Sequence, residues 1–149
     1  MKPLLEEWRK FLAEEKPLYA GILKLTLPRI TKSEVEAMQI MLPEKAKHLS
    51  KDDLHVTLIH QSILKPFEKA IKHIDFPAPP PVILEDDVWE RVSPGKKSWA
   101  IRLKNQNDMR EYVRQVMKLL GSTNVNPEPE RIFHVSIANL TGNPHDSVR

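Results

Sequence analysis

The 149-residue chain contains no cysteine, which excludes a disulfide, a thiolate nucleophile and a cysteine metal site. Glycine occurs only 4 times, and neither a GxGxxG nor a P-loop pattern is present, so the usual glycine-rich phosphate cradles are missing. No apolar run reaches the roughly 18 residues of a membrane span, and the first residues lack the apolar segment of a signal peptide. We therefore expect a cytoplasmic protein in which side chains, and not glycine-rich backbone, handle any phosphate.

The charge balance is only slightly basic. The net charge is +3, from 23 basic and 20 acidic residues. This excess is compatible with a small anionic ligand, but it is too small to indicate binding to a long nucleic-acid duplex.

Apolar periodicity predicts an α+β fold in one bilobal domain over residues 1–149. Each half of the sequence places a helix after a strand and a further strand after that helix, so we expect two lobes related by a pseudo-two-fold. Helices are predicted over residues 3–15, 33–42, 66–74 and 108–120. Strands are predicted over residues 18–27, 54–59, 82–92, 98–104 and 132–138.

A short pattern occurs twice, once in each half of the chain. His-Val-Thr-Leu begins at His55 and His-Val-Ser-Ile begins at His134, each inside a predicted strand. Side chains on a strand alternate between its faces with a period of two. His55 and Thr57 therefore share one face, His134 and Ser136 share one face, and the apolar residues between them point into a core.

Two strands that each present an imidazole and a hydroxyl can cleave a phosphodiester. The reaction needs a base for the attacking oxygen, an acid for the leaving oxygen and donors for the non-bridging oxygens. Histidine reaches both protonation states near neutrality. We expect His55 and His134 to act as the acid–base pair and Thr57 and Ser136 to bind the phosphate. The sequence does not say which histidine is the base.

Three alternatives compete with this interpretation. Two histidines and a carboxylate could hold a divalent ion, but no His-Glu-x-x-His or aspartate-rich cluster is present, so we expect neither a metal nor another cofactor. The same face could serve a non-catalytic nucleotide- or RNA-binding module. The two motifs could also be a coincidence in an interaction protein.

The two motifs, at His55 and His134, resemble the signature of the 2H (two-histidine) phosphoesterase superfamily, His-x-Thr/Ser-x repeated on central strands. The resemblance implies antiparallel sheets that flank a central cleft, with helices outside, and the acid–base and phosphate-binding roles given above. It implies as substrate a nucleotide or cyclic oligonucleotide, with 2′,3′-cyclic phosphate ends of RNA as the alternative. The small chain and Tyr19 in the first strand resemble the phage branch that degrades cyclic oligonucleotide immune signals, which would act in the host cytoplasm.

Three further residues are candidates for substrate binding. Tyr19 could stack on a nucleobase or pack at the edge of the core, and the sequence favours neither. Trp99 follows the basic turn that contains Lys97, so the two residues could guide a nucleotide. For Trp99 the sequence favours a packed side chain beside a solvated turn over this role.

Overall fold

The computed structural model describes residues 16–148 and shows a mixed α+β protein whose paired strands are antiparallel. The chain forms two compact units, each assembled from three separate stretches of sequence. The first unit comprises residues 16–25, Leu58–Pro81 and Asn107–Arg131. The second unit comprises Thr26–Thr57, Val82–Gln106 and residues 132–148.

The first unit contains a hairpin of two strands, β1 (Leu18–Ala20) and β2 (Ile22–Thr26). We predicted one continuous strand here, and the structure divides it at Gly21. The φ angle of Gly21 is +80°, a conformation that side-chain-bearing residues rarely adopt. The glycine turns the chain back on itself, so that Tyr19 lies opposite Leu23.

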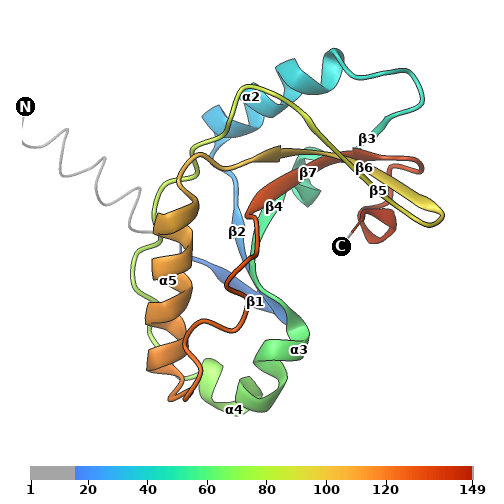
Figure 1. Cartoon of the computed structure of the whole chain (residues 1–149). Helices are drawn as coiled ribbons and strands as arrows, with labels where there is room; N and C mark the ends of the chain where they lie inside the picture. The colour runs from blue at the N-terminus through green and yellow to red at the C-terminus, as the bar shows by residue number, and fades with distance from the viewer. Residues whose placement is uncertain (1–15, 149) are drawn as a thin grey trace, which may run out of the picture. The chain divides into compact units, whose positions relative to one another are not determined.

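The helices of the first unit come later in the chain than this hairpin (Figure 1). In place of the single predicted helix, three short elements occur: α3 (Gln61–Leu64), the 3-10 turn η2 (Lys65–Phe67) and α4 (Glu68–Ile71). The long helix is α5 (Gln106–Leu119). One face of α5 is buried, at the i, i+3, i+4 spacing of an amphipathic helix. Its buried residues are Met109, Tyr112, Val113, Val116 and Met117.

Tyr112 shows how α5 holds a neighbouring loop of its own unit. Its hydroxyl donates a hydrogen bond of 2.7 Å to the carbonyl oxygen of Pro77. Burial raises the pKa of this phenol because the charged form would lose hydration. The side chain therefore remains a neutral donor.

The second unit carries both repeated motifs. Its strands are β3 (Lys47–His48), the start of β4 (His55–Ile59), β5 (Trp89–Ser93), β6 (Lys96–Arg102) and β7 (His134–Asn139). Its helix is α2 (Arg29–Ile40), and its 3-10 turns are η1 (Lys51–Asp53) and η3 (Pro144–Asp146). The strands β4, β7, β6 and β5 are neighbours in this order, and β3 also pairs with β7 (Figure 1).

The core of the second unit lies behind the motif face. Val56, Val135 and Ile137, which we predicted to point inward, are fully buried, and this confirms the predicted alternation. Gln39 of α2 is also buried, and its Nε2 donates to the carbonyl oxygens of Leu49 and Ile137 at 3.2 and 2.9 Å. These bonds connect α2 to the backbone of β7 and to the residue that follows β3.

Several predicted boundaries are wrong. We predicted that α2 begins at Ser33, but its N-cap is Pro28, and the Ser33 hydroxyl donates to the Arg29 carbonyl inside the helix. Of the strand predicted over residues 82–92 only the end forms β5, although Leu84 makes an isolated bridge to Leu103. The helix predicted over residues 3–15 lies outside the described residues. Within residues 16–148, no helix is both long and apolar enough to cross a membrane.

Candidate functional site

The four motif residues lie on one unit and on two paired strands. His55 and Thr57 are on β4, and His134 and Ser136 are on β7. All four side chains are half-buried, whereas the residues between them are buried. The polar face predicted for each strand is therefore present, and the two polar faces belong to the same antiparallel pair.

The register of this pair sets the arrangement of the four side chains. Val56 of β4 lies opposite Val135 of β7. In an antiparallel pair this places His55 opposite Ser136 and Thr57 opposite His134. The two histidines are thus diagonal neighbours, as are the two hydroxyls, and a local two-fold passes between the valines.

Each motif histidine is held by the same hydrogen bond. His55 Nδ1 lies 2.8 Å from the carbonyl oxygen of Asp53, and His134 Nδ1 lies 2.9 Å from that of Ile132. A carbonyl oxygen only accepts, so Nδ1 must carry the proton in both rings. The bond orients each ring and makes Nε2 the nitrogen that can gain or lose a proton.

Two residues of β5 surround His134. Trp89 packs edge-on against the imidazole, with ring centroids 5.6 Å apart and an interplanar angle of 89°. Arg91 Nη1 lies 3.0 Å from His134 Nε2, and its guanidinium carbon lies 4.8 Å from the Trp89 ring centroid. Arginine is always a donor, so Nε2 accepts this bond and His134 is neutral in this arrangement.

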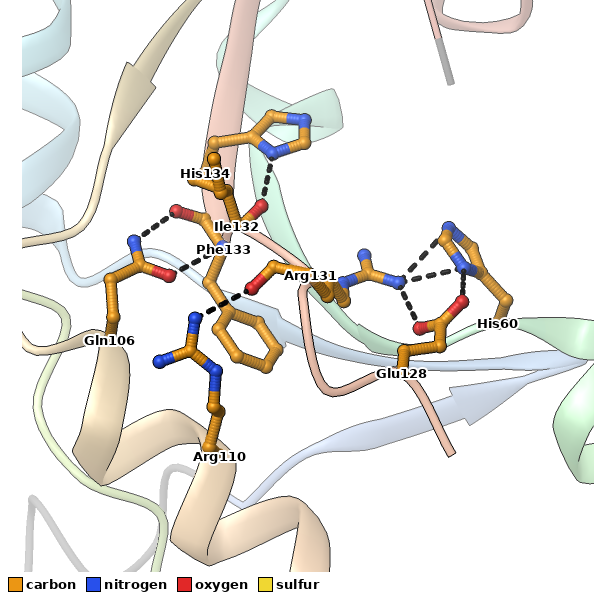
Figure 2. Close-up of polar contacts among 8 residues, drawn as sticks. All are labelled: His60, Gln106, Arg110, Glu128, Arg131, Ile132, Phe133 and His134. Atoms are coloured by element: carbon orange, nitrogen blue, oxygen red, sulfur yellow. Dashed lines mark hydrogen bonds and ion pairs between the residues drawn. The ribbon is translucent and has the colours of Figure 1, made fainter. Parts of the chain in front are cut away.

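Gln106 fixes the backbone just before His134 (Figure 2). Its Nε2 donates to the carbonyl oxygens of Leu103 and Phe133, both at 2.8 Å. Its Oε1 accepts from the Phe133 amide at 2.8 Å. The amide side chain therefore satisfies both backbone groups of the residue that precedes the motif.

A separate polar cluster forms in the first unit from His60, Glu128 and Arg131 (Figure 2). His60 Nδ1 lies 3.0 Å from Glu128 Oε1, and Arg131 Nη1 lies 2.9 Å from Glu128 Oε2. Arg110 Nη2 also donates to the Arg131 carbonyl at 3.1 Å. Partial burial of Glu128 opposes its ionisation, but the hydrogen bonds from His60 and Arg131 outweigh it and lower the pKa of the carboxyl.

This lowered pKa predicts a pH-dependent contribution to stability. The folded state favours the ionised carboxylate, so Glu128 stabilises the protein above the pKa of an unfolded glutamate. The contribution is lost as pH falls through the folded-state pKa. We expect Glu128→Gln to lower the free energy of unfolding near neutral pH and to have little effect in stronger acid, as measured by urea unfolding across pH. Glu130→Gln, at an exposed neighbouring carboxylate, is the control; equal curves for both variants would contradict the prediction.

The three candidates for substrate binding have different surroundings. Tyr19 is half-buried on β1 of the first unit, and its binding role stays a prediction. Trp99 is only 1% exposed, and its Nε1 donates to Glu90 Oε1 at 3.3 Å. Lys97 Nζ lies 5.2 Å from the Trp99 ring centroid and 3.4 Å from Glu90 Oε2. The structure thus gives Trp99 the packed position that the sequence favoured over contact with a nucleotide.

Sequence reasoning identified neither Arg91 nor Gln106, and it gave Trp89 no part in the site. Trp89 and Arg91 are two residues apart on one strand, so alternation alone would have placed them on the same face. What the sequence did not show is that this face lies beside His134, because the strands of the second unit are paired across long stretches of chain. Gln106 gave no signal, since an amide at the start of a helix is ordinary.

Among the residues that the structure describes, no group of three or more His, Cys, Asp or Glu side chains could hold a metal ion. Comparison with protein-family models finds no matching family, and searches of curated proteins and of solved structures find no match.

Proposed function

We propose that the protein is a metal-independent phosphodiesterase that hydrolyses nucleotide phosphodiester bonds, with His55 and His134 as its acid–base pair. The observation that carries the proposal is the matched Nδ1–carbonyl hydrogen bond of the two rings. Each bond presets one tautomer and directs proton exchange to Nε2. A neutral ring and a protonated ring then supply the base and the acid that phosphoester cleavage needs.

The spacing of the side chains supports a phosphate as the group between them. Diagonal neighbours on an antiparallel pair are about 7–8 Å apart, a separation that one phosphate can span with an imidazole on each side. Thr57 and Ser136 occupy the other diagonal by the same register. Their hydroxyls would donate hydrogen bonds to the non-bridging oxygens, where charge increases in the transition state.

The hydrolysis then follows from these positions. The neutral imidazole accepts a proton from water, and the water oxygen forms the new P–O bond. The P–O bond to the ester oxygen breaks, and the protonated imidazole donates its proton to that oxygen. Each ring ends in the opposite protonation state, and exchange with solvent restores the starting pair.

We extend the proposal to the 2H phosphoesterase superfamily and to cyclic di- or oligonucleotides as substrates. The local two-fold between β4 and β7 supports this assignment, because it relates His55 to His134 and Thr57 to Ser136. The pseudo-two-fold of the whole fold, the phage-type role and the cytoplasmic location belong to the same proposal.

A substrate panel tests the proposal. Wild-type protein is incubated in chelator with a cyclic dinucleotide, a 2′,3′-cyclic mononucleotide and short RNA, beside the variant in which His55 and His134 are both alanine. We expect turnover in chelator that the double variant lacks, with the cyclic dinucleotide preferred. Preference for the 2′,3′-cyclic mononucleotide would assign the protein to RNA ends. Tight binding without product would favour a binding module and refute the enzyme.

A further inference from the structure

Arg91 contacts His134 but has no part in the reaction proposed above. It is half-buried on β5, and its Nη1 bridges two acceptors, His134 Nε2 at 3.0 Å and the Val148 carbonyl oxygen at 2.9 Å. Its guanidinium also packs on Trp89. A cation is therefore held directly on the atom that is proposed to exchange a proton.

The C-terminal segment that supplies one of these acceptors is itself fixed. The Val148 amide donates to the hydroxyl of fully buried Ser98 at 2.6 Å. Asn139, also fully buried, donates from Nδ2 to the Asn143 carbonyl at 2.6 Å and to the Ser147 hydroxyl at 3.1 Å. The Val148 carbonyl that positions Arg91 beside His134 is therefore itself anchored by hydrogen bonds to buried side chains.

We infer that Arg91 is a phosphate-binding residue, which leaves His134 and moves to the scissile phosphate when substrate enters. The imidazole nitrogen and the amide carbonyl that Nη1 contacts are both uncharged groups. A phosphate oxygen is a stronger acceptor than either of them, because it carries a negative charge opposite the guanidinium, and the guanidinium fork matches two phosphate oxygens at once. The exchange needs a side-chain rotation on β5 and no change of fold.

The exchange also assigns the two proton-transfer roles, and in this it rests on the proposed function. While Arg91 donates to Nε2, His134 is neutral. When the guanidinium moves to phosphate, the same unprotonated Nε2 faces the substrate and serves as the base. His55 is then the acid.

The test compares three variants on the preferred member of the substrate panel. We expect Arg91→Ala to lower kcat/KM by about 100-fold, because a charge-assisted contact to phosphate is lost. Arg91→Lys should recover part of the loss, since it restores charge without the fork. Guanidinium ion at non-denaturing concentration should partly rescue Arg91→Ala. The control is Arg102→Ala: Arg102 packs on the same Trp89 ring but is paired with Glu85 and Asp87, and we expect a change within about threefold.

A binding measurement separates failure of this inference from failure of the proposed function. In protein labelled with ¹⁵N-arginine, the side-chain signal absent from Arg91→Lys identifies Arg91, and inorganic phosphate should shift it in wild type and in Arg102→Ala. An unmoved signal, or equal turnover of Arg91→Ala and Arg102→Ala, would overturn the role of Arg91. If wild type shows no turnover but phosphate still shifts the Arg91 signal, the proposed enzyme activity is refuted and the phosphate-binding role of Arg91 is supported.

Discussion

His55→Ala and His134→Ala should each lower kcat by about 10²–10⁴-fold, the usual contribution of a positioned acid or base. The double variant should lose little more than either single variant, because an acid without its base, or a base without its acid, no longer acts as a unit. Steady-state kinetics on the preferred substrate measure all three losses. His73→Ala, at an exposed histidine of the first unit, is the matched control and should retain full turnover.

The leaving group distinguishes the two histidines. A p-nitrophenyl phosphodiester releases an anion that needs no proton donor, so loss of the acid should matter less with this substrate than loss of the base. We expect the nitrophenyl ester to restore much of the turnover of His55→Ala and little of that of His134→Ala. The reverse order would exchange the two roles, and multiplicative losses in the double variant would argue against an acid–base pair.

Trp99→Ala should lower the free energy of unfolding by about 3–5 kcal/mol, a larger loss of stability than we expect from any substitution at the motif residues. The indole is 1% exposed at the centre of β6, which pairs with both β5 and β7, so truncation leaves a buried cavity. Chemical denaturation measures the loss. If the alanine variant does not fold, Trp99→Phe should fold with a smaller loss, because an aromatic ring is retained and the bond to Glu90 is removed.

Trp89→Ala is the informative comparison, because Trp89 is half-buried on the neighbouring strand. It touches the ring of His134 and the guanidinium of Arg91. We expect Trp89→Ala to lower turnover strongly and the free energy of unfolding only slightly, whereas Trp99→Ala should do the opposite. A stable Trp99→Ala protein with a raised KM would instead show that Trp99 binds substrate.

Local pattern was sufficient for the motif strands. Alternation between apolar and polar residues located β4 and β7. It also placed Val56 and Val135 on the correct face, because a strand buried on one side has apolar residues at every second position. The α5 helix followed in the same way from its apolar face. These elements depend on neighbours in sequence.

Features that depend on distant partners were not predictable. The contact of Trp89 with His134 depends on β5 pairing with β6 and β6 with β7, and no local spacing in the sequence shows that order. Two further errors were local. The division of the first predicted strand required knowing that Gly21 has a positive φ. Serine is a preferred N-cap residue, which favoured a helix start at Ser33, but the N-cap of α2 is Pro28, five residues earlier. The two motif histidines could therefore be chosen as candidates from the sequence, while the contact of Arg91 with His134 became visible only in the structure.

The two-fold between Val56 and Val135 has a consequence for the direction of cleavage. Turning a phosphodiester by half a turn exchanges the two rings and the two hydroxyls but presents it with the same set of groups. The motifs alone therefore do not distinguish the two orientations in which a substrate could bind. Polarity must come from residues that break the symmetry, and Arg91 and Trp89 do so, because both approach from β5 on the His134 side. Under the proposed function, β5, which carries Arg91 and Trp89, and not the two motifs, would select the departing oxygen.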